Sequence, residues 1–392
     1  MRILFVHSGA DMYGASRSLL RLTTRLAQDA NAVKVVLPYD GPLREALERQ
    51  GIEVDLENGL SIVTRRMFRT PLGLLKFVLN VPLSTCKLWF KAREFRPDLI
   101  HTNTALIIPP GIVSRLMFIP HVWHVREFFS EFPWFLRVYQ WFMLTFSDVI
   151  ICVSGPVASQ FHPLVRKKRI VVVHNGIPKD ELTKPDDTRV DKFRNTYGLN
   201  GQLLVGVVGR IKMGRKGQDV FVKAAALLHD KYPGAKFICI GSPFPGNDNH
   251  LRHLVDQVNR AGLTPQFVYT GDVPDVQAAY AALDVSVLPS VLPEPFGGVV
   301  LESMAMGKPV VGTRIGGTVE QIEDGVTGLL VEPGNENSLA EALDKLLADA
   351  DLRQRMGENA RQRFLSEFEM TAFYERILSI YKKVCMRLAA NT

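Results

Sequence analysis

Short apolar runs alternate with helical patterns along the whole chain, and this alternation limits the fold more than any other feature of the sequence. The runs of the first half cover residues 3–7, 33–37, 53–56, 99–101, 122–124, 148–153 and 170–173. Those of the second half cover residues 203–208, 235–240, 266–269, 285–288 and 310–312. Strands that alternate with helices in this way form parallel sheets covered on both faces. The pattern therefore predicts two doubly wound α/β domains in tandem.

A polar stretch between residues 182 and 195 separates the two sets of runs and is the best linker candidate. A chain of 392 residues with 46% apolar and 22% charged residues has the size and composition of two globular domains, each able to bury its own core. We place the domains at residues 1–185 and 190–374. Doubly wound sheets bind ligands beyond the carboxyl ends of their strands, so we expect a ligand in a central cleft that both domains face.

Cysteine usage and hydropathy indicate a cytoplasmic protein. The four cysteines lie far apart in the sequence, which excludes a cysteine-based zinc cluster and fits a reducing compartment. The N-terminal apolar run is too short for a signal peptide. The longest apolar stretch, residues 72–90, is interrupted by two lysines, an asparagine and a proline, so we expect no membrane-spanning helix.

The most informative motif is Glu294-Pro-Phe-Gly-Gly-Val-Val-Leu-Glu302, which lies between an expected strand and an expected helix. Its glycines, Gly297 and Gly298, allow backbone N–H groups to approach a ligand, and the start of a helix favours an anion. The motif therefore predicts a phosphate cradle with Glu294 beside it. Glu302, further along the helix, could accept hydrogen bonds from a ribose diol. The alternative is an ordinary strand-to-helix turn with a solvated Glu302.

A basic loop follows the expected strand at residues 203–208. Its charged members are Arg210, Lys212, Arg215 and Lys216. Arginine forks and lysine point charges at the carboxyl end of a strand suit a diphosphate. A solvated charged loop is the alternative, but a second anion-binding feature in the same domain argues against coincidence.

Two features of the N-terminal half are further candidates. The loop at residues 8–16 lacks the glycine fingerprint of nicotinamide dinucleotide folds, and its Gly14 either serves a turn or brings the backbone to a ligand. His124 lies near the carboxyl end of an expected strand, where catalytic side chains gather, or it is a buried core histidine. Arg126 and Glu127 either join the site or pair with each other.

Metal and nucleic-acid chemistry are not expected. The D-x-D sequence Asp349-Ala-Asp351 lies in a helical tail and indicates a solvated surface, and the histidines do not show metal-ligand spacing on a helix. The net charge of +7 forms no known nucleic-acid-binding pattern. No P-loop or G-x-S-x-G elbow is present.

The sequence resembles the retaining nucleotide-sugar glycosyltransferases of the two-Rossmann-domain (GT-B) architecture, family 4. The resemblance runs along nearly the whole chain and is most specific over residues 205–335. The motifs that carry it are Glu294 to Glu302, Gly316-Gly-Thr-Val-Glu320, Asp324-Gly-Val-Thr-Gly328, Gly209-Arg210, Lys216-Gly217 and His174-Asn-Gly-Ile177.

The resemblance implies a donor site in the C-terminal domain. Arg210 and Lys216 would hold the donor diphosphate, Glu302 would bind the ribose, and Glu294 would face the sugar near its anomeric carbon. The backbone that would meet the sugar and phosphates belongs to Phe296, Gly297, Gly298 and Val299. Many relatives place the lysine five residues after the arginine, where this chain has Arg215, so Arg215 and Lys216 both remain candidates for that role.

On the N-terminal domain, the resemblance implies that Gly14 lies against the diphosphate and that His124 stands near the sugar or the acceptor. The catalytic set would then be Glu294, His124, Lys216 and Arg210. The family often has two glycines where this chain has Gly14 alone. The resemblance also implies that the last helix, from about residue 375 to 392, packs on the first domain.

The implied activity is transfer of a hexose from a nucleoside-diphosphate sugar to a glycan acceptor, in bacterial-type cell-surface polysaccharide assembly. No metal or other cofactor is implied, because Arg210, Lys216 and a helix N-terminus can offset the charge of the leaving group. Three alternatives remain: a non-catalytic protein that binds the sugar nucleotide, a sugar-nucleotide epimerase and a phosphorylase. Donor base, sugar and acceptor are not specified by the sequence.

Segment 61–95 mixes basic and bulky apolar residues. Its basic members are Arg65, Arg66, Arg69, Lys76, Lys87, Lys91 and Arg93. Such a mixture fits a helix that lies on an anionic membrane, with a lipid-linked glycan as the acceptor and a peripheral location on the inner face of the cell membrane. It fits an ordinary amphipathic helix that covers the sheet equally well.

Overall fold

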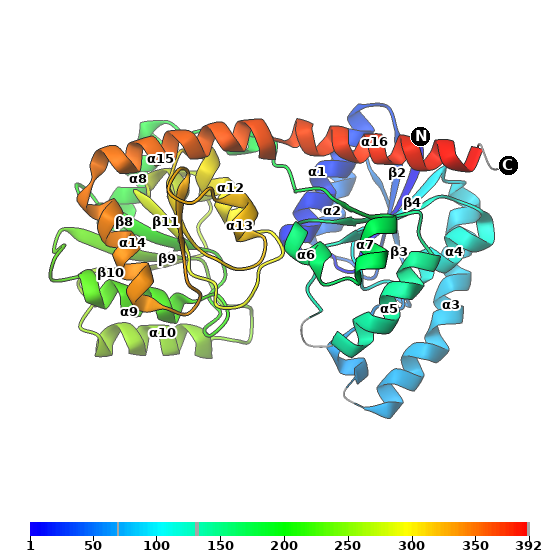
Figure 1. Cartoon of the computed structure of the whole chain (residues 1–392), viewed down its shortest axis with the longest axis horizontal. Coiled ribbons are helices and arrows are strands. Elements are labelled where there is room, and N and C mark those ends of the chain that lie inside the picture. The colour runs from blue at the N-terminus through cyan, green and yellow to red at the C-terminus, as the bar shows by residue number, and fades with distance from the viewer. Residues whose placement is uncertain (69, 130–132, 390–392) are drawn as a thin grey trace. The chain divides into compact units, whose positions relative to one another are not determined.

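The structure is a computed structural model that describes residues 1–68, 70–129 and 133–389. The chain divides into two compact units (Figure 1). Unit 1 comprises Met1–Gly176 and Met370–Thr392, and unit 2 comprises Ile177–Glu369. Each unit is built around one parallel sheet, which confirms the predicted pair of doubly wound α/β domains.

Unit 1 contains a seven-stranded sheet in the order β3-β2-β1-β4-β5-β6-β7. Its strands are β1 (Arg2–Val6), β2 (Ala32–Leu37), β3 (Glu53–Leu56), β4 (Leu99–Thr102), β5 (His121–Val125), β6 (Val149–Cys152) and β7 (Ile170–Val172). All seven runs predicted for this half are strands. The strand order reverses at β1, whose Val6 pairs with Val36 on one side and with Thr102 on the other. Such a reversal opens a crevice at the carboxyl edge of the sheet.

The helices of unit 1 cover this sheet. They are α1 (Gly14–Gln28), α2 (Pro42–Arg49), α3 (Pro71–Phe95), α4 (Pro109–Met117), α5 (Pro133–Thr145), α6 (Gly155–Ser159), α7 (Pro163–Arg169) and α16 (Met370–Ala389), with a 3-10 turn η1 (Arg65–Phe68). The C-terminal α16, drawn in red in Figure 1, packs its Ile377 and Tyr381 into the same core as Ile3 and Leu22. It begins at Met370, a few residues before the expected start.

Unit 2 contains a six-stranded sheet in the order β10-β9-β8-β11-β12-β13. Its strands are β8 (Leu203–Val208), β9 (Ala235–Ile240), β10 (Phe267–Gly271), β11 (Val285–Leu288), β12 (Val310–Thr313) and β13 (Gly328–Val331). The first five coincide closely with the predicted runs, whereas β13 was not among them. It adds to the edge of the sheet through the pairing of Val310 with Gly328. A Cβ on Gly328 would lie 2.1 Å from the Val310 carbonyl oxygen, so this close approach requires glycine.

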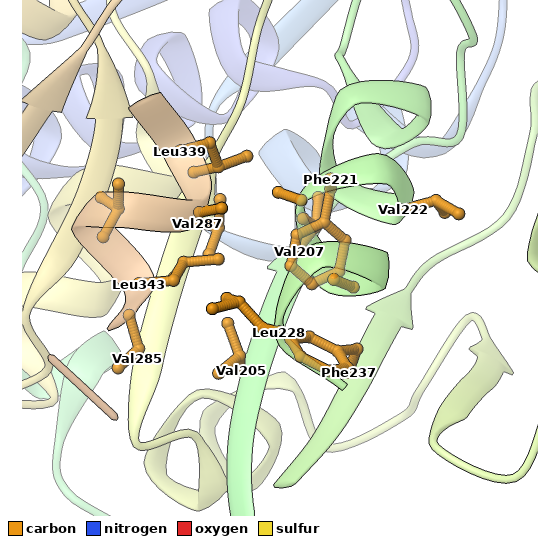
Figure 2. Close-up of a cluster of buried hydrophobic side chains, with 14 of the residues drawn as sticks. Val205, Val207, Phe221, Val222, Leu228, Phe237, Val285, Val287, Leu339 and Leu343 are labelled. Carbon is orange, nitrogen blue, oxygen red and sulfur yellow. The ribbon is translucent and has the colours of Figure 1, made fainter. Parts of the chain in front are cut away.

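The helices of unit 2 are α8 (Asp187–Thr196), α9 (Gln218–Leu228), α10 (Asn249–Arg260), α11 (Val276–Ala282), α12 (Gly298–Ala305), α13 (Thr318–Gln321), α14 (Glu336–Ala348) and α15 (Ala350–Arg363). Figure 2 shows part of the core. Side chains of β8 and β11, such as Val207 and Val287, meet Phe221 and Leu228 of α9 and Leu343 of α14. This apolar contact fixes the carboxyl ends of the central strands, from which the candidate site is built.

The predicted linker at residues 182–195 is wrong, because most of it is ordered on unit 2. A short 3-10 turn, η2 (Lys179–Leu182), precedes α8. Leu182 and Phe193 are buried in the core of this unit, and Arg189 pairs with Asp275 at 2.8 Å. The polar residues of this stretch face solvent while two apolar side chains anchor it. The division between the units accordingly falls at Gly176 and Ile177 rather than near residue 185.

The long helix α3 has two different halves. Its buried residues, from Ser84 to Phe95, all lie in the second half, which packs on the sheet as an ordinary covering helix. The first half, up to Pro82, contains no fully buried residue, and most of its side chains are exposed. In the described part of the chain, no helix is long and apolar enough to cross a bilayer.

Candidate functional site

Three loops of unit 2 meet at the carboxyl ends of β8, β11 and β12. They are the basic loop before α9, the loop that carries Glu294 and the turn at Gly316. Two glycines allow the loops to touch: a Cβ on Gly217 would lie 1.7 Å from the Pro289 carbonyl oxygen, and a Cβ on Gly316 would lie 2.3 Å from that of Glu294. Both glycines have positive φ angles, which a side chain would strain further. The loops are therefore held together by backbone contacts.

Lys216 and Glu294 form the centre of this site. The Lys216 Nζ lies 2.5 Å from the Glu294 Oε1, and the Ser290 hydroxyl donates to the same oxygen at 2.7 Å. Ser290 is buried, and its own carbonyl accepts a hydrogen bond from the Thr313 hydroxyl at 2.8 Å. The structure thus brings together the predicted lysine and carboxylate. Ser290 is an additional member that the sequence analysis did not assign a role.

The backbone and the side chains of the basic loop make different contacts. The Arg215 carbonyl accepts hydrogen bonds from the N–H groups of Val291 and Leu292, so this residue joins two loops through its backbone. The Arg210 guanidinium lies over the ring of Phe244, 4.9 Å from its centroid. Because Lys216 directs its ammonium at Glu294, the geometry favours Lys216 over Arg215 as the lysine of the donor site.

The helix that begins at Gly298 carries the rest of the motif. No side chain caps its first turn, and a Cβ on Gly298 would find no atom within 4 Å. The buried side chain of Gln321 holds the preceding loop by accepting from the Gly297 N–H and donating to the Gly297 carbonyl. The helix α12 thus starts from a fixed loop, and no side chain caps its first N–H groups. An anion is favoured at such a helix end.

Glu302 is oriented by a buried tyrosine. The Tyr280 hydroxyl, from α11, donates to the Glu302 Oε2 at 2.6 Å. Tyr280 is 1% exposed, so its hydroxyl reaches Glu302 from the core of unit 2. Glu302 is half-buried and is held by this hydrogen bond, and its contact with a ribose stays a prediction. A tyrosine within an alanine-rich helix indicates core packing, which is why the sequence analysis did not find it.

Unit 1 has a polar cluster at the carboxyl ends of β1, β4 and β5. The buried Arg126 guanidinium donates to the Asn103 side chain at 3.1 Å and to the Asn175 side chain at 2.6 Å. Burial lowers the pKa of Arg126 to about 10. Glu127 does not pair with this guanidinium, because its carboxylate accepts instead from Thr104 and from the Ala105 N–H. The suggested Arg126–Glu127 ion pair is thus absent from this cluster.

His124 lies in the interior of unit 1. It is fully buried, its Nδ1 faces Arg126 at 3.2 Å, and its ring lies near Phe373 of α16. Burial and the Arg126 charge hold the pKa of His124 well below its usual value, so the ring is neutral. This placement agrees with the core-histidine alternative, and contact of His124 with a sugar or acceptor stays a prediction. Gly14 starts α1 and has no atom near its Cβ direction, which leaves room for a ligand.

A metal centre is not formed by the part of the chain that the structure describes. No three His, Cys, Asp or Glu residues cluster there in a way that could hold an ion.

Two parallel α/β units, each with a doubly wound sheet, define a protein of the GT-B fold class. Residues 12–181 match the family model "Glycosyltransferase Family 4", and residues 190–363 match "Glycosyl transferases group 1". The chain therefore belongs to the family 4-like glycosyltransferases, as the sequence resemblance implied.

Individual relatives agree with this assignment. The D-inositol 3-phosphate glycosyltransferase of Corynebacterium jeikeium is 34% identical over 55% of this chain and 52% of its own length. The capsular polysaccharide biosynthesis glycosyltransferase CapM of Staphylococcus aureus is 29% identical over 56% of each chain. This chain thus spans about half the length of the curated relatives it matches.

Solved structures extend the likeness to the whole chain. The crystal structure of Anabaena HepE in complex with UDP superposes with a TM-score of 0.83, covers 98% of this chain and 100% of its own, and is 26% identical. HepE was also solved in complex with UDP-glucose, with a TM-score of 0.81. The match to a complete two-domain protein confirms the fold class beyond the regions covered by the curated relatives.

Proposed function

We propose that the protein is a retaining hexosyltransferase that moves a sugar from a nucleoside-diphosphate sugar to a glycan acceptor. The observation that carries the proposal is the contact between Lys216, Glu294 and Ser290 at the carboxyl edge of unit 2, next to the uncapped start of α12. A cation, a carboxylate and open N–H groups are the components that a sugar diphosphate requires.

The chemistry follows from where charge develops. Breaking the anomeric C–O bond builds negative charge on the departing nucleoside diphosphate and positive charge on the sugar. Arg210, Lys216 and the α12 N-terminus offset the negative charge on the leaving group, and Glu294 stabilises the positive charge on the sugar. These groups replace the divalent cation that diphosphate departure otherwise requires. Retention is proposed through attack on the same face, with the donor phosphate accepting the acceptor proton.

Glu302 binds the ribose of the donor. Its carboxylate, fixed by Tyr280, lies on the helix whose first turn receives the phosphates, so one element holds both ends of the nucleoside diphosphate. We propose a UDP-sugar as the donor, supported by the UDP and UDP-glucose complexes of HepE.

The acceptor proposed is a lipid-linked glycan of cell-surface polysaccharide assembly. The name of CapM supports the pathway class, and the exposed first half of α3 supports peripheral attachment to a membrane, with the protein at its cytoplasmic face. The acceptor and the membrane location both go beyond the glycosyltransferase family assignment.

The test is ligand-induced stabilisation, followed by transfer. The purified protein is melted with UDP, GDP, dTDP and ADP in the presence of EDTA, and a nucleotide at 100 times its Kd should add about 2.7 kcal/mol of stability. We expect UDP to give the largest shift. NMR of the anomeric proton in a product formed from the matching UDP-sugar then decides retention. A flat panel, or a shift that needs a divalent cation, would contradict the proposal.

A further inference from the structure

Two helices of unit 1 expose a continuous set of large apolar side chains. Those of the first half of α3 are 42 to 67% exposed and those of α5 are 43 to 71% exposed. They are Leu72, Leu74, Leu75, Val78, Leu79 and Leu83 on α3, and Trp134, Val138 and Trp141 on α5. We call this set the α3–α5 face.

The two helices adjoin at their N-terminal ends. The Phe68 ring, in η1 just before α3, lies 5.4 Å from the Trp134 ring and 5.1 Å from the Phe135 ring, both at the start of α5. Figure 1 draws these ends at the same end of unit 1, while α3 packs along α4. Segments distant in sequence therefore meet at this end of unit 1.

The α3–α5 face cannot be explained by packing within unit 1. All buried residues of α3 lie beyond Pro82, from Ser84 onward. The first half carries apolar side chains on more than one side, and a helix of that composition buries them against another apolar phase.

Most charged residues of the helices that form this face are basic. Residues 64–93 contain no acidic residue, and Asp148 is the only one between residues 133 and 169. Exposed basic side chains are contributed by α3, α5 and α7, whose Pro163–Arg169 sequence ends in four consecutive cations. They are Lys76, Arg137, Arg166, Lys167 and Lys168.

Some of the basic residues of segment 61–95 do not contribute to this surface. Lys87 pairs with Glu57 at 3.0 Å, and Lys91 lies 3.6 Å from Asp55, both at the sheet edge. Arg69 and the side chains of Arg65 and Arg66 lie outside the described residues. The basic residues of α7 are further exposed cations, and the sequence analysis did not connect α7 with α3. Trp141 joins α5 to α7, because its ring lies 5.6 Å from that of His162 at the start of α7.

We propose that the α3–α5 face docks on an anionic lipid bilayer, with Leu75, Leu79 and the two tryptophans at the headgroup boundary and the α7 cations on the lipid phosphates. Tryptophan and lysine at a membrane interface, with apolar side chains below them, match the layered polarity of a bilayer surface. A mainly basic surface suits anionic headgroups, because each basic residue near the bilayer adds electrostatic attraction. The inference deepens the proposed function, on which it rests for the lipid-linked acceptor.

The experiment is flotation of the full-length protein with phosphatidylcholine vesicles, with and without phosphatidylglycerol, at low and high salt. We expect binding to the anionic vesicles that salt weakens. Leu79→Glu and Val138→Glu should each lower the vesicle partition coefficient about tenfold or more, since each removes an apolar side chain of roughly 1.5–3 kcal/mol from the lipid and adds a negative charge. Leu227→Glu, at an equally exposed position of α9 in unit 2, is the matched control and should bind like the wild type.

A second pair of variants tests the electrostatic part. Lys167→Glu with Lys168→Glu should remove most of the dependence on phosphatidylglycerol, whereas Lys382→Glu with Lys383→Glu, on the exposed side of α16, should retain it. Stabilisation by UDP is measured for every variant as a check on folding.

The outcomes separate this inference from the proposed function. UDP stabilisation without vesicle binding overturns the docking proposal and leaves the donor site intact. Vesicle binding without UDP stabilisation contradicts the proposed function alone. A wild-type dimer that Leu79→Glu converts to a monomer, with no vesicle binding, would assign the face to a second copy of the chain and reject the membrane.

Discussion

Lys216 and Glu294 pair with each other in the structure, although they are proposed to act on different parts of one donor. The Glu294 Oε1 accepts from both the Lys216 ammonium and the Ser290 hydroxyl. A diphosphate attracts the lysine more strongly than one carboxylate does, because it offers more charge. Ser290, which is buried and fixed by Thr313, would then keep Glu294 in place beside the sugar. The ion pair thus keeps both groups close to the positions proposed for them.

Replacement of Lys216 by alanine should lower kcat about a hundredfold or more, the effect of removing one preorganised charge-stabilising group. Steady-state transfer from the UDP-sugar identified by melting measures this. Lys223→Ala is the matched control, since Lys223 is exposed on α9 and lies 3.8 Å from Glu336, away from the loops. Turnover of Lys216→Ala within a few-fold of wild type, with folding intact, would remove the lysine from the mechanism.

Replacement of Tyr280 by phenylalanine should weaken UDP binding about tenfold, because Glu302 loses the hydrogen bond that orients it and hydrogen bonds to charged groups contribute roughly 1.5–3 kcal/mol. Isothermal titration with UDP measures the change. Inorganic diphosphate, which has no ribose, is the matched probe and should bind both proteins equally. Equal losses for the two ligands would mean that Tyr280 supports the loops rather than the ribose site.

At the scale of elements, the C-terminal helix α16 completes unit 1. Its Tyr381 hydroxyl and the His101 Nδ1 share a hydrogen bond of 2.7 Å, between residues that are both fully buried and 280 positions apart in sequence. The other ring nitrogen of His101, Nε2, has no hydrogen-bond partner among the described residues. The helix is therefore joined to β4 by one buried hydrogen bond in addition to its apolar face.

Replacement of Tyr381 by phenylalanine should destabilise the protein by about 1–3 kcal/mol, since it leaves the buried His101 Nδ1 without a hydrogen-bond partner. Urea unfolding followed by tryptophan fluorescence measures this. Tyr39→Phe, at a half-exposed position, should change stability by less than about 0.5 kcal/mol. A Tyr381→Phe protein as stable as wild type would show that the apolar contacts of α16 suffice.

The strands were predicted better than the segments that join them. Twelve apolar runs were expected, and each is a strand, because a strand buried between helices must be apolar throughout its length. The four-residue β13 was missed, since its pattern is too short to distinguish from a loop. The segment at α8 was predicted as a linker because its sequence is mostly polar. In the structure, only Phe193 of the ten residues of α8 is buried.

At the scale of the whole molecule, the buried histidines are unevenly divided between the two units. His7, His101, His121 and His124 are buried in unit 1, and burial is the largest cause of the lowered pKa of each. For His7 and His121 the pKa falls to about 4, from an ordinary value of 6.5. The folded unit therefore binds fewer protons than the unfolded chain between these two values.

Unit 1 should lose stability as the pH falls from about 6.5 toward 4, by roughly 3 kcal/mol for each of these two histidines. The sign follows because protons bind the unfolded state first and draw the equilibrium toward it. All four tryptophans, Trp89, Trp123, Trp134 and Trp141, belong to unit 1, so fluorescence-detected melting reports on this unit. Far-UV circular dichroism, which sees both units, provides the comparison. A fluorescence melting temperature that stays constant or rises across this pH range would contradict the prediction.

The sequence alone determined the class of the fold, all strands except β13 and the family, and it predicted the loop residues of the proposed donor site, because each of these depends on patterns within short segments. Only the tertiary structure decided which groups meet. It paired Lys216 with Glu294 across 78 positions, brought Tyr280 to Glu302, enclosed His124 beneath α16, and joined α3, α5 and α7 into one surface. Such contacts depend on how strands are ordered in a sheet and on which helix covers which face. Local periodicity carries neither kind of information.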